Sequence, residues 1–207
     1  MIKMLFNKKN NSGLSIIEVL VVIFILTVIG VAVAKFQIDI FSFSTSLSNT
    51  LVAQQEVRQA FKMMSGEIRS LSVSSIGSYP IAEADSTSFT FYSDIDDDGL
   101  KERIRYFLDG NILKKGTIKP TGSPLIYNPA NEKVTEVVHY IANSGIPIFD
   151  YYDAYYDGTT LPIPLPVNLS EVRLVKITIF TDRDPSRSPA PLSMTTHVSM
   201  RNLKDNL

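Results

Sequence analysis

The stretch of sequence that decides the fold is LSIIEVLVVIFILTVIGVAVA, residues 14–34. It contains one charged side chain, Glu18. An α-helix of this length, with a rise of 1.5 Å per residue, would be about 31 Å long, which matches the hydrocarbon core of a bilayer. The stretch therefore predicts a helix that can span a membrane.

The flanking residues separate a membrane anchor from an ordinary secretory signal. Lys3, Lys8 and Lys9 precede the apolar run without an acidic residue, so we expect a cytoplasmic N-terminus and an extracytoplasmic head. A secretory signal has an apolar region of about 7–15 residues and a cleavage site with small residues. This run is longer and continues beyond Ala34 as KFQIDIF. The pattern favours a single-pass anchor.

Glu18 needs an explanation of its own. A carboxylate within a membrane-spanning helix costs about 2.5–3.5 kcal/mol on insertion scales, so such residues usually have a partner or a function. One interpretation is that Glu18, near the start of the helix, stays in the headgroup layer. The other is that it pairs with a cation in an apolar environment.

Residues 8–19, KKNNSG followed by LSIIEV, resemble the type III signal of type IV prepilins and type II secretion pseudopilins. In that family a prepilin peptidase cuts after the glycine, the new first residue is methylated, and glutamate stands fifth. The resemblance implies cleavage between Gly13 and Leu14, and an assembly role for Glu18. Leu14 stands where the family usually has phenylalanine or methionine, and the helix proline of major pilins is missing.

The resemblance also implies partners and a location. In a filament core, the α-amine of a neighbouring subunit can pair with Glu18. The implied partners are other pilins or pseudopilins, the prepilin peptidase and an inner-membrane assembly platform, and the filament would lie in the periplasm or at the cell surface. Cleavage removes three lysines and leaves 17 basic and 21 acidic residues, a formal charge of −4. This negative charge disfavours nucleic-acid binding.

Helical spacing continues after the apolar run, with apolar residues three or four positions apart. We expect one helix from Leu14 to Leu71, with weak points at Gly30 and residues 42–50. Its second half should pack against a sheet. The predicted parts are a leader (1–13), a membrane or filament-core half (14–35), an amphipathic half (36–72) and a β-rich head (73–207). The stripe expected in the core comprises Val57, Ala60, Phe61, Met64, Ile68 and Leu71.

The head is rich in Val, Ile, Thr and aromatic residues, which favours strands, and Asp109-Gly110-Asn111 predicts a hairpin turn. A long helix followed by antiparallel strands is the α+β architecture of the type IV pilin fold. Residues 166–177, after the aromatic run 149–153, have a looser resemblance to the minor pseudopilin J group. The predicted strands are 89–93, 103–108, 112–115, 134–141, 148–152, 172–180 and 192–200.

An acidic motif, DIDDDGLKE, occupies residues 94–102. Oxygen ligands at its first, third and fifth positions (Asp94, Asp96 and Asp98), with glycine sixth, resemble the opening of an EF-hand calcium loop. Leu100 would add a carbonyl and Glu102 a further oxygen. Position twelve, however, is Arg105 instead of glutamate. The two interpretations are a calcium site and a solvated hairpin turn.

No motif in the sequence indicates catalysis. The chain has no cysteine, two histidines and no P-loop or GxGxxG sequence. Residues 150–158 combine tyrosines with carboxylates, which suits a carbohydrate or calcium site, or tyrosines that cover the core. His139 is expected to be partly buried, and His197 lies in the last predicted strand. We therefore expect no enzyme activity and no cofactor other than calcium.

The leading hypothesis is a minor pilin or pseudopilin, a structural filament subunit processed by a prepilin peptidase. The first alternative is a filament-tip module that captures DNA, a surface or a secreted substrate through the loops near residues 151–157. The second is a membrane-anchored extracytoplasmic enzyme.

Overall fold

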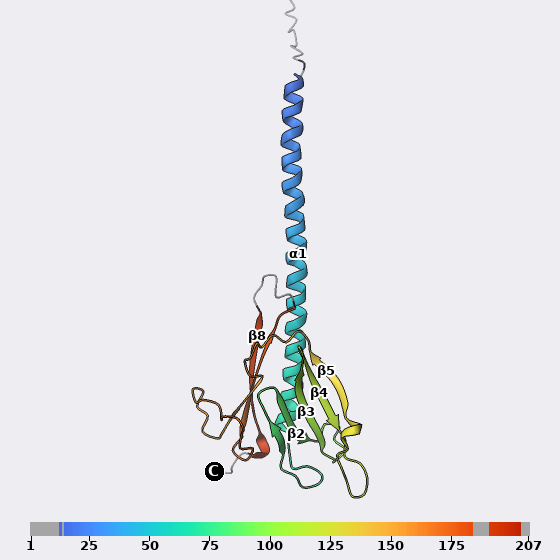
Figure 1. The fold of residues 1–207 in the computed structure, drawn as a ribbon, viewed down its shortest axis with the longest axis vertical. Coiled ribbons are helices and arrows are strands. Elements are labelled where there is room, and N and C mark those ends of the chain that lie inside the picture. The colour runs from blue at the N-terminus through green and yellow to red at the C-terminus, as the bar shows by residue number, and fades with distance from the viewer. Residues whose placement is uncertain (1–12, 14, 184–190, 204–207) are drawn as a thin grey trace, which may run out of the picture. The chain divides into compact units, whose positions relative to one another are not determined.

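The computed structural model describes residues 13, 15–183 and 191–203, so the predictions for Leu14 and for the lysines of the leader lie outside the described residues. The chain divides into two compact units, residues 1–47 and 48–207. Figure 1 shows the fold and labels several of its elements. In chain order the elements are α1 (Ile16–Arg69), β1 (Ile81–Ala84), β2 (Ser88–Ser93), β3 (Glu102–Asp109), β4 (Ile112–Ile118), η1 (Pro129–Asn131), β5 (Lys133–Val138), β6 (Phe149–Tyr152), β7 (Leu174–Thr181), β8 (Leu192–Ser199) and η2 (Arg201–Leu203).

The helix α1 is continuous over 54 residues, which confirms the predicted helix to within two residues at each end. Neither weak point interrupts it. The hydroxyl groups of Thr27, Ser42 and Thr45 donate to backbone carbonyls three or four positions earlier in the helix. These bonds satisfy the three hydroxyl groups within the helix, where they do not divert the backbone from its helical hydrogen bonds.

In the first unit, α1 exposes apolar side chains in every direction. An 18-residue window has a mean hydropathy of 3.1 and none of it is buried within the structure. Large side chains such as Phe24, Leu26 and Phe36 are exposed. This segment has the length and composition of a single-pass membrane anchor.

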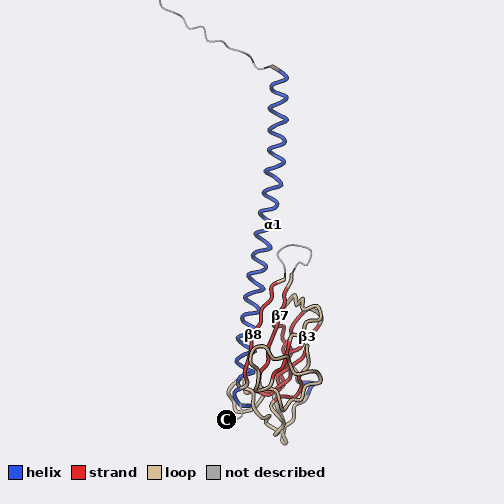
Figure 2. The backbone as a smooth tube through the Cα atoms, turned by 90° about the vertical axis from the view of Figure 1, so that its left-hand side faces the viewer, coloured by secondary structure: helices blue, strands red, loops and turns tan. Residues whose placement is uncertain are grey.

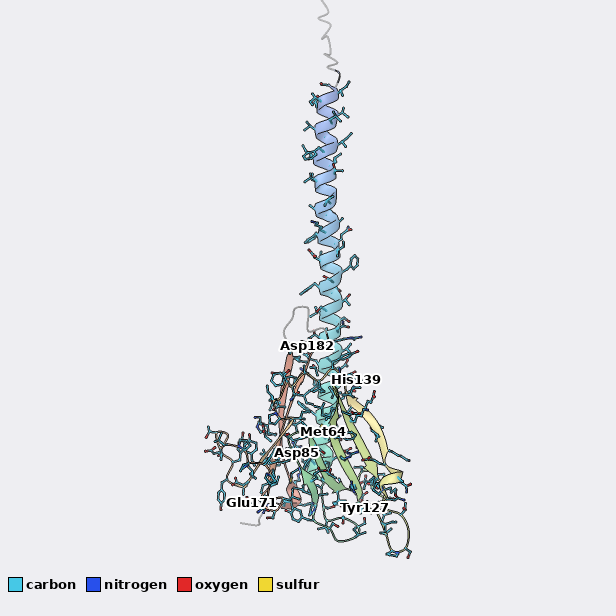
Figure 3. The ribbon with its side chains drawn as sticks, in the orientation of Figure 1. Met64, Asp85, Tyr127, His139, Glu171 and Asp182 are labelled. Atoms are coloured by element: carbon cyan, nitrogen blue, oxygen red, sulfur yellow. The ribbon has the colours of Figure 1, made fainter. Side chains whose placement is uncertain are left out.

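In the second unit, α1 buries one face. Its buried residues are those of the predicted stripe, Val57, Ala60, Phe61, Met64 and Ile68, and Leu71 just after the helix is buried too. They share one core with side chains of both sheets, and Met64 lies among them between the helix and the strands (Figure 3). A helix with a single apolar stripe packs in this way because only that stripe gains by leaving water.

The larger sheet has the strand order β1-β2-β3-β4-β5, with every neighbouring pair antiparallel. The predicted hairpin turn connects β3 to β4: Asp109 pairs with Ile112, and Gly110 has a φ of 61°. Glycine adopts this conformation without the steric cost that a Cβ would add.

The smaller sheet has the order β6-β7-β8 and is also antiparallel. Figure 2 shows strands of both sheets beside the final turns of α1. The segment between β5 and β6 connects the sheets through a bridge between Ile141 and Thr181. Asn143 adds to this connection, because its side chain donates to the Thr178 carbonyl and accepts from the Phe180 amide.

Aromatic side chains fill the space between the sheets. The ring of Phe89 on β2 lies 5.1 Å from that of Phe91, 6.0 Å from that of Phe149 and 5.5 Å from that of Tyr151. All four residues are buried. The hydroxyl group of Tyr151 donates to the carbonyls of Asp85 and Ser88, so even this buried polar group is satisfied.

Seven strands were predicted, and each is present with shifted ends. The fourth predicted strand, expected to extend to Ile141, corresponds to β5 and ends earlier, at Val138, after which Tyr140 adopts a positive φ of 59°. The strand β1 was not predicted. Its sequence, IAEA, has little β-propensity, and it forms as the outer partner of β2.

A largely buried ion pair joins α1 to the larger sheet. The Glu67 carboxylate accepts hydrogen bonds from the Lys115 ammonium group on β4 and, at 2.7 Å, from the Tyr106 hydroxyl group on β3. Burial, followed by the charge of Glu67, raises the pKa of Tyr106 far above its usual value. The phenol therefore remains protonated and donates to Glu67.

Candidate functional site

The start of α1 carries the residues that the sequence assigned to processing and assembly. The Ser15 carbonyl accepts from the amides of Glu18 and Val19, at 3.0 and 3.2 Å, so Glu18 lies in the first turn of the helix. A carboxylate there is stabilised by the positive end of the helix dipole. Gly13, three positions before the first helical residue, is exposed, and Glu18 is exposed as well.

The acidic motif forms the loop between β2 and β3. Asp97 and Gly99 adopt positive φ values of 57° and 88°, which reverse the chain within a few residues. Side chains then fix the loop: the Gly99 amide donates to Asp94 at 3.1 Å and the Leu100 amide donates to Asp98 at 2.8 Å. The loop is therefore held by its own carboxylates.

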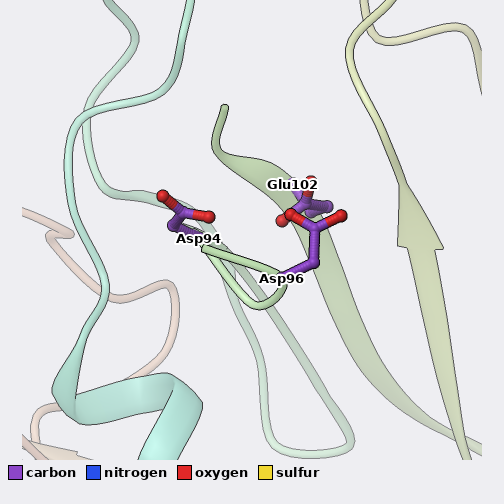
Figure 4. Close-up of side chains that lie close together, drawn as sticks. All are labelled: Asp94, Asp96 and Glu102. Atoms are coloured by element: carbon purple, nitrogen blue, oxygen red, sulfur yellow. The ribbon is translucent and has the colours of Figure 1, made fainter. Parts of the chain in front are cut away.

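Three carboxylates meet at this loop. Asp94, Asp96 and Glu102 each contribute one oxygen to a group in which all oxygens lie within 4.8 Å of one another, close enough to share one metal ion (Figure 4). Glu102 is only 2% exposed. Burial raises the pKa of the Glu102 carboxyl group, and the negative charge of Asp96 adds to this rise.

Two lysines neutralise part of this charge. Lys101 lies 2.8 Å from Asp94, and its hydrogen bond lowers the pKa of that carboxyl group. Lys119 pairs with both Asp96 and Asp98. Sequence reasoning missed both lysines. Lys119 reaches the loop because Arg103 on β3 pairs with Ile118 on β4. Composition and spacing do not reveal this register.

Of the four predicted carboxylate ligands, the structure brings together three, Asp94, Asp96 and Glu102. Asp98 is engaged by Lys119 and by the Leu100 amide and does not belong to the three-carboxylate group, whereas the carbonyl ligand expected from Leu100 stays a prediction. The EF-hand template also fails at position twelve. Arg105 lies within β3, where it makes two hydrogen bonds, of 3.0 and 2.8 Å, to Glu132.

The tyrosine-rich segment divides into a buried and an exposed part. Tyr151 and Tyr152 are buried, as the core interpretation predicts, whereas Tyr155 is 84% exposed. The ring of Tyr156 lies 4.2 Å from that of Tyr152 and stacks 5.8 Å from that of His197 on β8. This segment offers an exposed aromatic surface.

The carboxylates beside these tyrosines are engaged within the protein. Asp150 lies 3.2 Å from Lys176. Asp157 accepts bonds from the backbone amides and hydroxyl groups of Thr159 and Thr160, which hold the pKa of its carboxyl group far below its usual value. The bonds of these two aspartates explain the segment as a structured loop.

His139 lies between two carboxylates at the surface. Its Nε2 is 3.0 Å from Glu136 and its Nδ1 is 3.5 Å from Glu56 on α1. The hydrogen bond to Glu136, more than that to Glu56, raises the pKa of His139. Its side chain is partly buried, as predicted.

Comparison with known families supports the interpretation of the N-terminus. Residues 8–34 match the model of the prokaryotic N-terminal methylation motif. No curated protein matches the chain. The motif is a prepilin-type signal, and here it is followed by a long apolar helix and a β-sheet head. The motif thus indicates a prepilin-peptidase substrate of the type IV pilin or pseudopilin kind, and the α+β architecture is consistent with a pilin fold.

Proposed function

We propose that this protein is a minor pilin or pseudopilin, a structural subunit of a type IV pilus or a type II secretion-like filament. The observation that carries the proposal is the prepilin-type motif at residues 8–34, on a helix whose apolar window is entirely unburied. Such a surface is costly in water, and it is stable in a bilayer before assembly and among other such helices after it.

The proposal gives each part of the chain a role. Cleavage after Gly13 removes the leader, the first half of α1 is transferred from the membrane to the filament core, and the head remains outside the membrane. Other pilins or pseudopilins and an inner-membrane assembly platform are the proposed partners. The role is structural and not catalytic.

Intact-mass analysis tests the proposed processing. When the chain is produced in a host with an active prepilin peptidase, we expect a mature protein that begins at Leu14 and carries one added methyl group. The same chain from a host without the peptidase is the control and should retain residues 1–13. A mature chain that begins at Met1 in both hosts, or one cut beyond Ala34, would refute the proposal.

A second candidate function is ligand capture at a filament tip, which the exposed Tyr155 and the Tyr156–His197 stack favour. Aromatic surfaces of this kind suit carbohydrate rings or apolar protein segments. If capture is the function, Tyr155→Ala should leave filament assembly intact and abolish retention of the secreted substrate or surface ligand. Normal retention by this variant removes the candidate.

A further inference from the structure

The geometry points to a calcium site in the β2–β3 loop, formed by the carboxylates of Asp94, Asp96 and Glu102. This site does not depend on the proposed filament function, because all three residues lie in the second compact unit. The inference rests on two independent observations: the convergence of the three oxygens, and the unsatisfied state of the most deeply buried carboxylate.

The unsatisfied group is the Oε1 atom of Glu102. Its other oxygen accepts from the Ile95 amide at 3.1 Å, but Oε1 is buried and has no hydrogen-bond partner. A buried carboxylate oxygen without a partner is costly, and native proteins pair such atoms with a donor or a metal ion. The Glu102 carboxylate converges with those of Asp94 and Asp96, which cannot donate a hydrogen bond while they are ionised (Figure 4).

Asp94 repeats this arrangement. Its Oδ2 accepts from the Gly99 amide and from the Lys101 ammonium group, whereas Oδ1 is buried without a partner. In both residues one oxygen fixes the orientation of the side chain and the other remains available. This is the arrangement of a preorganised ligand set, in which the ligands need little rearrangement to bind the ion.

The charge and openness of the site favour calcium. Three ionised carboxylates attract a divalent cation, and Lys101 and Lys119 neutralise only part of the charge of the loop. The side chain of Asp96 is 49% exposed, so water can complete the coordination on that side. Calcium accepts six to eight oxygen ligands in flexible geometry, whereas magnesium requires a near-ideal octahedron. Three protein ligands predict weak binding, with a Kd of about 10⁻⁴–10⁻³ M.

The test uses the full mature chain in detergent micelles. Near-UV circular dichroism reports the melting of the head, because the chain has nine tyrosines and no tryptophan. We expect 10 mM CaCl₂ to raise Tm by about 3–10 °C, and equilibrium dialysis to find one calcium ion per chain. NaCl at equal ionic strength should leave Tm unchanged, and MgCl₂ should have a clearly smaller effect.

Two variants and a matched control locate the ion. Glu102→Gln and Asp96→Asn should each abolish both the Tm shift and calcium retention in dialysis. Because Asp96 is exposed, its variant tests the site even if the change at the buried Glu102 prevents folding. Asp97→Asn removes the same charge from the same loop outside the ligand group, and it should keep both responses, since asparagine tolerates the positive φ at this position.

Three outcomes would overturn the inference. The wild-type Tm could stay constant with calcium, which would mean that Glu102 is buried as a neutral acid. Magnesium could act as strongly as calcium, which would remove the assignment to this ion. Asp97→Asn could lose calcium as completely as Asp96→Asn, which would mean that the general charge of the loop attracts the ion.

Discussion

Two parts of the single helix α1 differ in how their apolar side chains are buried. Between residues 16 and 47 its large apolar side chains are exposed, whereas between residues 48 and 69 a narrow stripe is buried in a core of the protein's own making. The backbone is helical throughout, so hydrogen bonding does not distinguish the two parts. The two parts differ in the environment that their apolar surfaces require. Residues 48–69 pack against the protein's own sheets, whereas residues 16–47 need a membrane or other subunits.

The largest effect that would distinguish the two parts of α1 is expected on filament assembly, from a substitution at Glu18. Glu18→Ala should be inserted and cleaved like the wild type but should fail to assemble, because the α-amine of a neighbouring subunit would lose its counter-charge in an apolar core. Intact mass measures cleavage, and recovery of sheared filaments measures assembly. Asp39→Ala removes the other carboxylate of this part of α1 and should still assemble. Normal assembly of Glu18→Ala would place Glu18 in the headgroup layer only.

A smaller effect compares one substitution in the two parts. Ile68 is 0% exposed and Ile25 is 49% exposed. Ile68→Ala should lower the free energy of unfolding of the head by about 2–5 kcal/mol, since it leaves a cavity. Ile25→Ala should change that free energy by less than about 0.5 kcal/mol. Urea unfolding of the full chain in micelles measures both. Equal losses would show that the two parts of the helix share one environment, contrary to the contrast.

The smallest effect concerns His139, through which Glu56 of α1 is linked to the segment after β5. Because its neighbours raise the pKa of His139, its contribution to stability is fully present below the unfolded pKa of about 6.5 and is lost as the pH rises through the higher folded pKa. The side chain is 38% exposed, so we expect about 0.2–1 kcal/mol. Urea midpoints at pH 6 and pH 8 should differ more for the wild type than for His139→Gln. An identical pH dependence in both proteins would contradict the prediction.

Local sequence patterns account for much of the fold. Three segments could be predicted because residues within a few positions decide their conformation. They are the continuous apolar run, the helical stripe from Val57 to Ile68 and the Asp109-Gly110-Asn111 turn. The strand β1 could not be, because its sequence has little preference of its own and its conformation comes from pairing with β2. The division into two sheets was also not predictable, since it depends on long-range contacts such as those of Asn143.

The acidic loop shows the same limit within a candidate site. The spacing of its aspartates was visible in the sequence, and it drew attention to the correct loop. Glu102 was expected only to add a further oxygen; its burial was not visible, because that depends on the formation of β3. The role of Lys119 depends on the pairing of β3 with β4, which brings a residue from the end of another strand to the loop.

The pairing of Arg105 with Glu132 limits which sequences this sheet can accept. A Cβ at Gly116 on β4 would lie 2.2 Å from a carboxylate oxygen of Glu132, which two hydrogen bonds from Arg105 hold in place. Any larger residue at position 116 therefore requires the Glu132 side chain to shift, which disturbs its hydrogen bonds to Arg105. The three positions are therefore coupled: a side chain at 116 and Glu132 in its observed position compete for the same space beside Arg105.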